Sequence, residues 1–126
     1  MFKVVGLLKR RPGLTREQFI AHYESIHAPW GTQYQKGKMG KEGRYFRRYL
    51  IPHAHPLDAG SSIREPEYDV ITEHWCDSRA QYESTMGQFR APDLASWATD
   101  DELLLFDRTK SLHFIVEQEL ESDISE

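Results

Sequence analysis

The segment between residues 10 and 29 constrains the fold of this chain more than any other. Residues 2–9 are short, apolar and partly β-branched, which is typical of a strand, and Pro12-Gly13 then provides a turn. Thr15 and the glutamine three residues later have capping-box spacing, so a helix is expected to begin directly after Thr15. It should end near Ala28, because a residue that precedes proline disfavours helical geometry.

One face of this expected helix carries aromatic side chains and a histidine. Phe19, Tyr23 and His27 are spaced four apart, so they stack on one helical face, and Ile26 extends the apolar stripe. The end of a helix also favours a cation. His27 is therefore either a simple charge complement to the helix end or a general acid or base that faces a cavity.

The remaining chain predicts three strands and further helix. The strands are expected at residues 44–51, 68–76 and 110–117. A second capped helix should follow Ser78 through Tyr82, Met86 and Phe89, and another helical piece should follow Asp93 with Leu94, Trp97 and residues 103–105. Residues 30–43 are expected to be irregular, and residues 53–66 a long loop.

This order is β-α-β-β-α-β, the ferredoxin-like split βαβ arrangement. It predicts an α+β fold in which helices cover one face of a four-stranded antiparallel sheet. The expected domain spans residues 1–118, and the acidic residues 119–126 form a tail. An aromatic-rich second face left uncovered would be a large apolar patch, so a homodimer that pairs two sheets is expected.

Composition restricts the classes of partner. The chain has 126 residues, which fits one domain, and its 16 Lys and Arg against 20 Asp and Glu argue against nucleic acid. Cys76 is the single cysteine, so no intrachain disulfide can form, which fits a reducing compartment. The N-terminal apolar run is too short for a signal peptide or a membrane helix. A cytoplasmic protein without a membrane partner is expected.

His74 is the second candidate for proton transfer among six histidines. It lies within the expected strand at residues 68–76, where successive side chains point to opposite faces. Thr72, His74 and Cys76 therefore share one face, and Ile71, Glu73 and Trp75 share the other. The alternation alone does not decide which face lines a cavity.

Other motifs carry weaker signals. His53 and His55 have a spacing found at metal sites, but two ligands do not complete a site, and a loop that closes over a ligand or a plain surface loop fits them better. Pro12-Gly13 and the glycines at 37 and 40 do not form a phosphate-binding loop. Neither a metal nor another cofactor is expected.

Several of these residues together resemble the EthD-domain family of the dimeric α/β-barrel superfamily. The resemblance rests on residues 4–8, 11–15 and 18–19 with Tyr23, His27 and Pro29, and more loosely on Arg47-Arg48-Tyr49, Tyr68-Asp69, Glu73 and Trp75-Cys76-Asp77. It implies a ferredoxin-like protomer, a homodimer and a cavity between helices and sheet. It also implies kinship with cofactor-free fungal polyketide decarboxylases and dehydratases and with methylmuconolactone methylisomerases.

The resemblance further implies roles for the two histidines. His27 matches the histidine of the family's first helix, and His74 stands where the methylisomerases have a catalytic cysteine, which favours His74 in the cavity. The expected function is a cofactor-independent lyase or isomerase of a phenolic, polyketide-like or lactone substrate. Alternatives are a non-catalytic binder of small aromatic molecules and a haem-dependent monooxygenase-like relative.

In this mechanism His27 moves the proton, and His74 acts as its counterpart or polarises a carbonyl. Tyr23 or Tyr45 would donate to a developing oxyanion. The remaining expected substrate contacts are Trp30, Trp75, Trp97 and His53.

Overall fold

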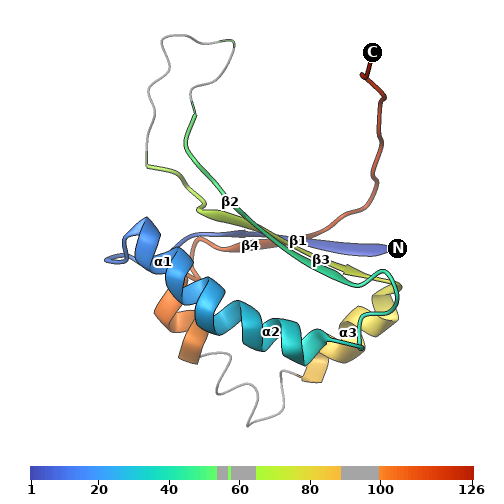
Figure 1. Ribbon diagram of the computed structural model, residues 1–126, viewed down its shortest axis with the longest axis horizontal. Coiled ribbons are helices and arrows are strands. Elements are labelled where there is room, and N and C mark those ends of the chain that lie inside the picture. The colour runs from blue at the N-terminus through green and yellow to red at the C-terminus, as the bar shows by residue number, and fades with distance from the viewer. Residues whose placement is uncertain (54–56, 58–64, 89–99) are drawn as a thin grey trace.

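The structure is a computed structural model that describes residues 1–53, 57, 65–88 and 100–126. Its sheet contains β1 (Phe2–Leu8), β2 (Arg44–Tyr49), β3 (Val70–Cys76) and β4 (Leu112–Ile115) in the order β2-β3-β1-β4, with antiparallel neighbours. The helices α1 (Arg16–His22), α2 (Ala28–Gln35) and α3 (Arg79–Gly87), with a helix at residues 100–105, lie below this sheet in Figure 1. The predicted α+β, ferredoxin-like arrangement is thereby confirmed.

Local chemistry explains where the helices begin. The Thr15 hydroxyl accepts a hydrogen bond from the Gln18 backbone N–H at 3.1 Å, and the Gln18 side chain accepts one from the Thr15 N–H at 2.9 Å. This is the predicted capping box, which satisfies two helix-end donors. The Ser78 hydroxyl likewise accepts from the Gln81 N–H at 3.2 Å and begins α3.

The first helical segment does not end near Ala28, and the expectation that residues 30–43 are wholly irregular is wrong. A π-helical turn, η1 (Tyr23–His27), follows α1, and α2 continues to Gln35 with Pro29 in its first turn. Proline is tolerated at the first positions of a helix, where its missing N–H removes no intrahelical bond. The wider turn also leaves Ile26 at 47% exposure, off the stripe that an α-helix would have buried.

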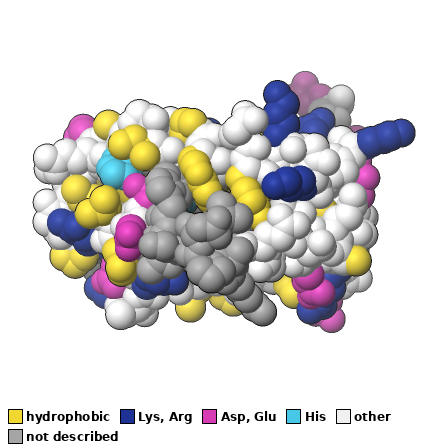
Figure 2. Space-filling model, turned by 90° about the horizontal axis from the view of Figure 1, so that it is seen from below, with side chains coloured by type: hydrophobic (Ala, Val, Ile, Leu, Met, Phe, Trp, Pro, Cys, Tyr) yellow, Lys and Arg dark blue, Asp and Glu magenta, His cyan; other side chains and the backbone are white. Residues whose placement is uncertain are grey.

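The core lies between the sheet and the helices. Phe19 is fully buried and makes edge contacts with the rings of Tyr23, Tyr49 and Phe106. Full burial of one such ring contributes about 1.5–3 kcal/mol. The cluster also contains Leu8, Ala28, Val70 and Leu105. From the helix side, hydrophobic side chains lie among charged ones (Figure 2).

No helix formed by the described residues lies over the other face of the sheet (Figure 1). Leu112 and Phe114 of β4 are 44% and 51% exposed there, on the same face as Trp75 of β3. Residues 116–126, all described, form neither helix nor strand and leave the sheet on this side (Figure 1). One tail contact is an ion pair of 2.7 Å between Lys3 Nζ and Glu119 Oε2.

Candidate functional site

A cavity of about 320 Å³ lies between the sheet and the helices. All four strands or their immediate neighbours, the π-turn, α2, α3 and the segment after residue 100 contribute to it. Its described lining residues are Leu8, Tyr23, His27, Trp30, Gly31, Gln35, Tyr45, Thr72, His74, Tyr82, Met86, Glu102, Phe106, Arg108 and His113. It therefore brings both candidate histidines and both candidate tyrosines into one site.

A glycine helps to keep this space open. A side chain at Gly6 of β1 would meet the Thr72 hydroxyl at 2.5 Å and the His113 ring at 3.3 Å. Because Gly6 has no Cβ, the neighbouring strands can present both of these polar groups to the cavity. Any larger residue at this position would have to displace the Thr72 side chain.

His27 is held by a carboxylate from a distant part of the chain. Its Nδ1 lies 2.6 Å from Oδ2 of Asp101, and the other oxygen, Oδ1, lies 2.8 Å from Nε2 of His22. Asp101 is only 7% exposed. A buried carboxylate needs such partners, because leaving it unpaired would cost several kcal/mol. Since Asp101 engages Nδ1, proton exchange by His27 with a ligand would have to use Nε2.

His74 is held by a neutral amide instead. The Gln35 Nε2 donates to the Gly31 carbonyl at 3.1 Å, which turns its Oε1 toward His74, and His74 Nδ1 donates to that oxygen at 2.8 Å. Burial, with smaller contributions from the charges of His113 and Arg47, lowers the pKa of His74 from 6.5 to about 4. His74 is therefore neutral at pH 7, and Nε2 carries its lone pair.

The tyrosine pair forms a third polar element of the site. The hydroxyls of Tyr23 and Tyr45 share a short hydrogen bond. Burial raises the pKa of Tyr45 to about 12 and that of Tyr23 well above its usual value, so both remain protonated. The Tyr45 ring stacks on His74 with 4.5 Å between centroids, and the Arg47 guanidinium lies 4.8 Å from the centroid of the same Tyr45 ring.

The structure also places the other predicted contacts. Trp30 lines the cavity. Trp75 does not, which corrects that expectation: strand alternation puts it on the opposite face from His74, against Lys3 and Phe46. His53 is exposed and is not among the lining residues, whereas Trp97 and His55 lie outside the described residues.

Sequence reasoning missed Asp101, Gln35 and His113. Asp101 is separated from His27 by 74 positions, and Gln35 from His74 by 39. Gln35 was missed because residues 30–43 were expected to be irregular. In the structure, Gln35 lies at the end of α2, and its side chain reaches His74 on the sheet. His113 alternates with Leu112 and Phe114 on β4, and that pattern could have marked it as facing the helices.

Two negative findings apply to the described part of the chain. Within it, no group of three or more His, Cys, Asp or Glu side chains is arranged to hold a metal ion. No helix there has the length and apolar character needed to cross a membrane.

The fold and the cavity define an α+β domain of the ferredoxin-like class. The sequence profile of the EthD domain matches residues 11–104, and the chain therefore belongs to the EthD family, as the resemblance had indicated. A search of curated proteins finds no match.

A solved structure supports the same fold. An ethyl tert-butyl ether d (EthD) family protein from Bacillus halodurans c-125 is similar over 94% of this chain and 100% of its own, with a TM-score of 0.59 and 16% identity. A dimeric ferredoxin-like protein of unknown function from Thermobifida fusca YX matches 91% of this chain and 88% of its own, with a TM-score of 0.49 and 13% identity.

Proposed function

We propose that this protein is a cofactor-independent lyase or isomerase that moves a proton at a carbon next to a carbonyl group of a small aromatic, polyketide-like or lactone molecule. The observation that carries the proposal is the pair of histidines on one cavity, one backed by a buried carboxylate and the other by an amide. Titratable groups whose surroundings differ in this way are suited to different steps of acid–base catalysis.

The two partners assign different roles. His27 can hold an abstracted proton, because Asp101 lies 2.6 Å from its ring and would stabilise the imidazolium. His74 remains neutral and offers an acceptor, so it would bind a substrate hydroxyl rather than polarise a carbonyl. In the step, the C–H bond breaks, the proton passes to His27 Nε2, and the electron pair moves onto the carbonyl oxygen as an enolate.

The enolate oxygen needs a donor. One of the hydroxyl hydrogens of Tyr23 and Tyr45 is used between the two residues, which leaves the other for a ligand. Arg108 also lines the cavity, where its charge is offset by an ion pair of 3.5 Å with Glu102, another lining residue. Donors placed where charge develops are a large source of rate enhancement.

The cavity sets the size and shape of the substrate. A volume of about 320 Å³ is at the lower end of the usual range for small-molecule sites and suits a molecule of one or two rings. Trp30, Tyr82 and Phe106 supply flat apolar walls. Such walls favour substrates whose enolate is delocalised into an aromatic system.

Deuterium uptake provides a direct test. The protein is incubated in D₂O with 2-tetralone, 2-coumaranone and 2,4-dihydroxyacetophenone, and loss of the α-hydrogen signal is followed by proton NMR. We expect catalysed exchange of at least one probe, with the double variant His27→Ala/His74→Ala as the blank. Exchange no faster than this blank for all three probes would count against the proposal, and saturable binding without exchange would favour a ligand-binding protein.

A homodimer is part of the proposal. Leu112 and Phe114 are exposed on the sheet face opposite the described helices. Trp75 Nε1 is buried on this face without a hydrogen-bond partner among the described residues. A second copy seated on this face would cover the apolar side chains. Light scattering should give twice the monomer mass, and Phe114→Glu should shift that mass toward the monomer; a monomer at all concentrations would contradict this part.

A further inference from the structure

We infer that Asp101 is a positioning residue for His27, and that the π-turn between His22 and His27 exists to let both rings bind this one carboxylate. The inference rests on the proposed function, since it assigns Asp101 a part in the proton transfer at His27. It stands on three observations: the two distances to Asp101, the burial of its carboxylate, and the irregular helix that carries the histidines.

The carboxylate binds one imidazole with each oxygen. His27 Nδ1 lies 2.6 Å from Oδ2, and His22 Nε2 lies 2.8 Å from Oδ1. An ionised carboxylate only accepts hydrogen bonds, so both ring nitrogens donate. This fixes His27 as the tautomer with hydrogen on Nδ1, and it fixes the plane of a ring that lines the cavity.

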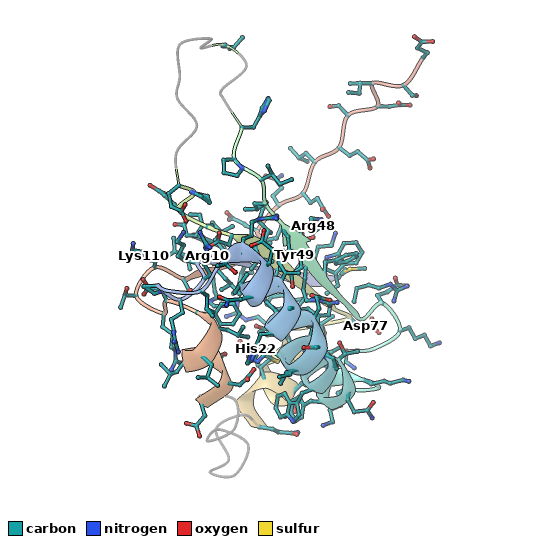
Figure 3. The ribbon with its side chains drawn as sticks, turned by 60° about the vertical axis from the view of Figure 1, so that its left-hand side comes forward. Arg10, His22, Arg48, Tyr49, Asp77 and Lys110 are labelled. Carbon is teal, nitrogen blue, oxygen red and sulfur yellow. The ribbon has the colours of Figure 1, made fainter. Side chains whose placement is uncertain are left out.

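The helix geometry makes this arrangement possible. In a regular α-helix, residues five apart point about 140° away from each other. Here η1 (Tyr23–His27) widens the turn, and the Ala28 N–H donates to the Tyr23 carbonyl five residues earlier. Residues five apart then point in more similar directions than in an α-helix, which lets His22 and His27 both reach Asp101. Figure 3 shows His22 on the helix side of the sheet, and Arg48 on the other side.

The two histidines that bind Asp101 have different roles. His27 has 15% of its side chain exposed and reaches the cavity, whereas His22 is 26% exposed and is not among the described lining residues. His22 holds the second oxygen and thereby restricts rotation of the carboxylate. A carboxylate held at both oxygens keeps the His27 ring in one orientation, which proton transfer requires.

A purely structural ion pair between helices is the competing explanation, and ring spectra separate the two. In uniformly ¹⁵N-labelled full-length protein, long-range proton–nitrogen correlations report which ring nitrogen carries hydrogen. We expect the fixed Nδ1–H tautomer of His27 in the natural protein and its loss in Asp101→Leu, because leucine has a similar size but offers Nδ1 no acceptor. Asp100→Leu, the same substitution at the exposed neighbouring residue, is the matched control.

The rate provides the second readout. With the probe that exchanges fastest, Asp101→Asn should lower kcat by about tenfold or more and leave KM within about twofold, because orientation acts on the proton-transfer step. Asp101→Glu keeps a carboxylate and should restore part of the rate. A folded Asp101→Leu protein with the natural His27 tautomer, or a folded Asp101→Asn protein with the natural kcat, would overturn the inference.

A second pair of variants covers failure of the Asp101 variants to fold. His22→Gln retains an N–H donor for Oδ1 of Asp101, and His22→Ala does not. We expect His22→Ala to lower kcat several-fold and His22→Gln to recover it; identical behaviour of the two would overturn the inference. If the natural protein exchanges no probe, the proposed function fails, whereas the ring spectra still decide whether Asp101 fixes the His27 tautomer.

Discussion

The two histidines of the cavity differ in the group that holds them. His27 donates to the buried carboxylate of Asp101 at 2.6 Å, whereas His74 donates to the amide oxygen of Gln35 at 2.8 Å. The two hydrogen bonds are similar in length and both use Nδ1. A carboxylate stabilises a positive ring more strongly than a neutral amide does, and for this reason the proposed function gives proton acceptance to His27 and a neutral role to His74.

This difference indicates that burial and nearby polar groups, rather than position in a motif, set the surroundings of each histidine. His27 lies on the π-turn and His74 in the middle of β3, and both were candidates on sequence alone. The partners come from segments far away in the chain. Three predictions follow from the contrast between a carboxylate and an amide partner.

The largest effect is expected from the loss of His27. His27→Ala should slow probe exchange about 10²–10⁴-fold, which is the usual contribution of a general acid or base. His74→Asn should cost less, because asparagine can still donate to Gln35. Initial rates from proton NMR in D₂O provide the measurement, with circular dichroism as the control for folding. Equal losses in the two variants would mean that the histidines do not differ in role.

The second prediction concerns stability in acid. The pKa of His74 is about 4 in the folded protein and 6.5 ordinarily, so between these pH values the unfolded chain binds the extra proton. Stability therefore rises with pH across this window, and the His74 contribution amounts to about 3 kcal/mol.

Urea unfolding at pH 7 and at pH 4 measures this contribution. The free energy of unfolding of the natural protein should fall by about 3 kcal/mol more than that of His74→Asn, which has no ring to protonate. Because both proteins share the other titrating groups, the variant is a matched reference. The same pH dependence in both proteins would show that His74 is not kept neutral by burial.

The smallest effect is expected from exchanging one partner type for the other. Gln35→Glu places a carboxylate beside His74 and so imitates the surroundings of His27. The pKa of His74 should rise by about 1 unit or more, which corresponds to about 1.4 kcal/mol. A proton NMR titration of the His74 ring measures this pKa. An unchanged pKa in a correctly folded Gln35→Glu protein would show that the residue at position 35 does not influence the protonation of His74.

Much of the fold could be predicted because its signals are local. The Thr15 capping box, the turn at Pro12-Gly13 and the alternation of β3 each depend on residues close together in the chain. The prediction failed at Pro29, where the rule that a helix ends before proline did not anticipate a π-turn. It also failed for Trp75, which was expected at the substrate for its aromatic ring although strand alternation places it on the face opposite His74.

The sequence by itself determined the order of helices and strands, the family, and the stripe that leads from Phe19 through Tyr23 to His27. Only the tertiary structure decided that Asp101 and Gln35 complete the site, and that His74 faces the same cavity as His27. The physical reason is that capping and strand alternation act between neighbours in the chain. The protonation of a buried ring depends on charges and dipoles a few ångströms away, which packing alone brings together.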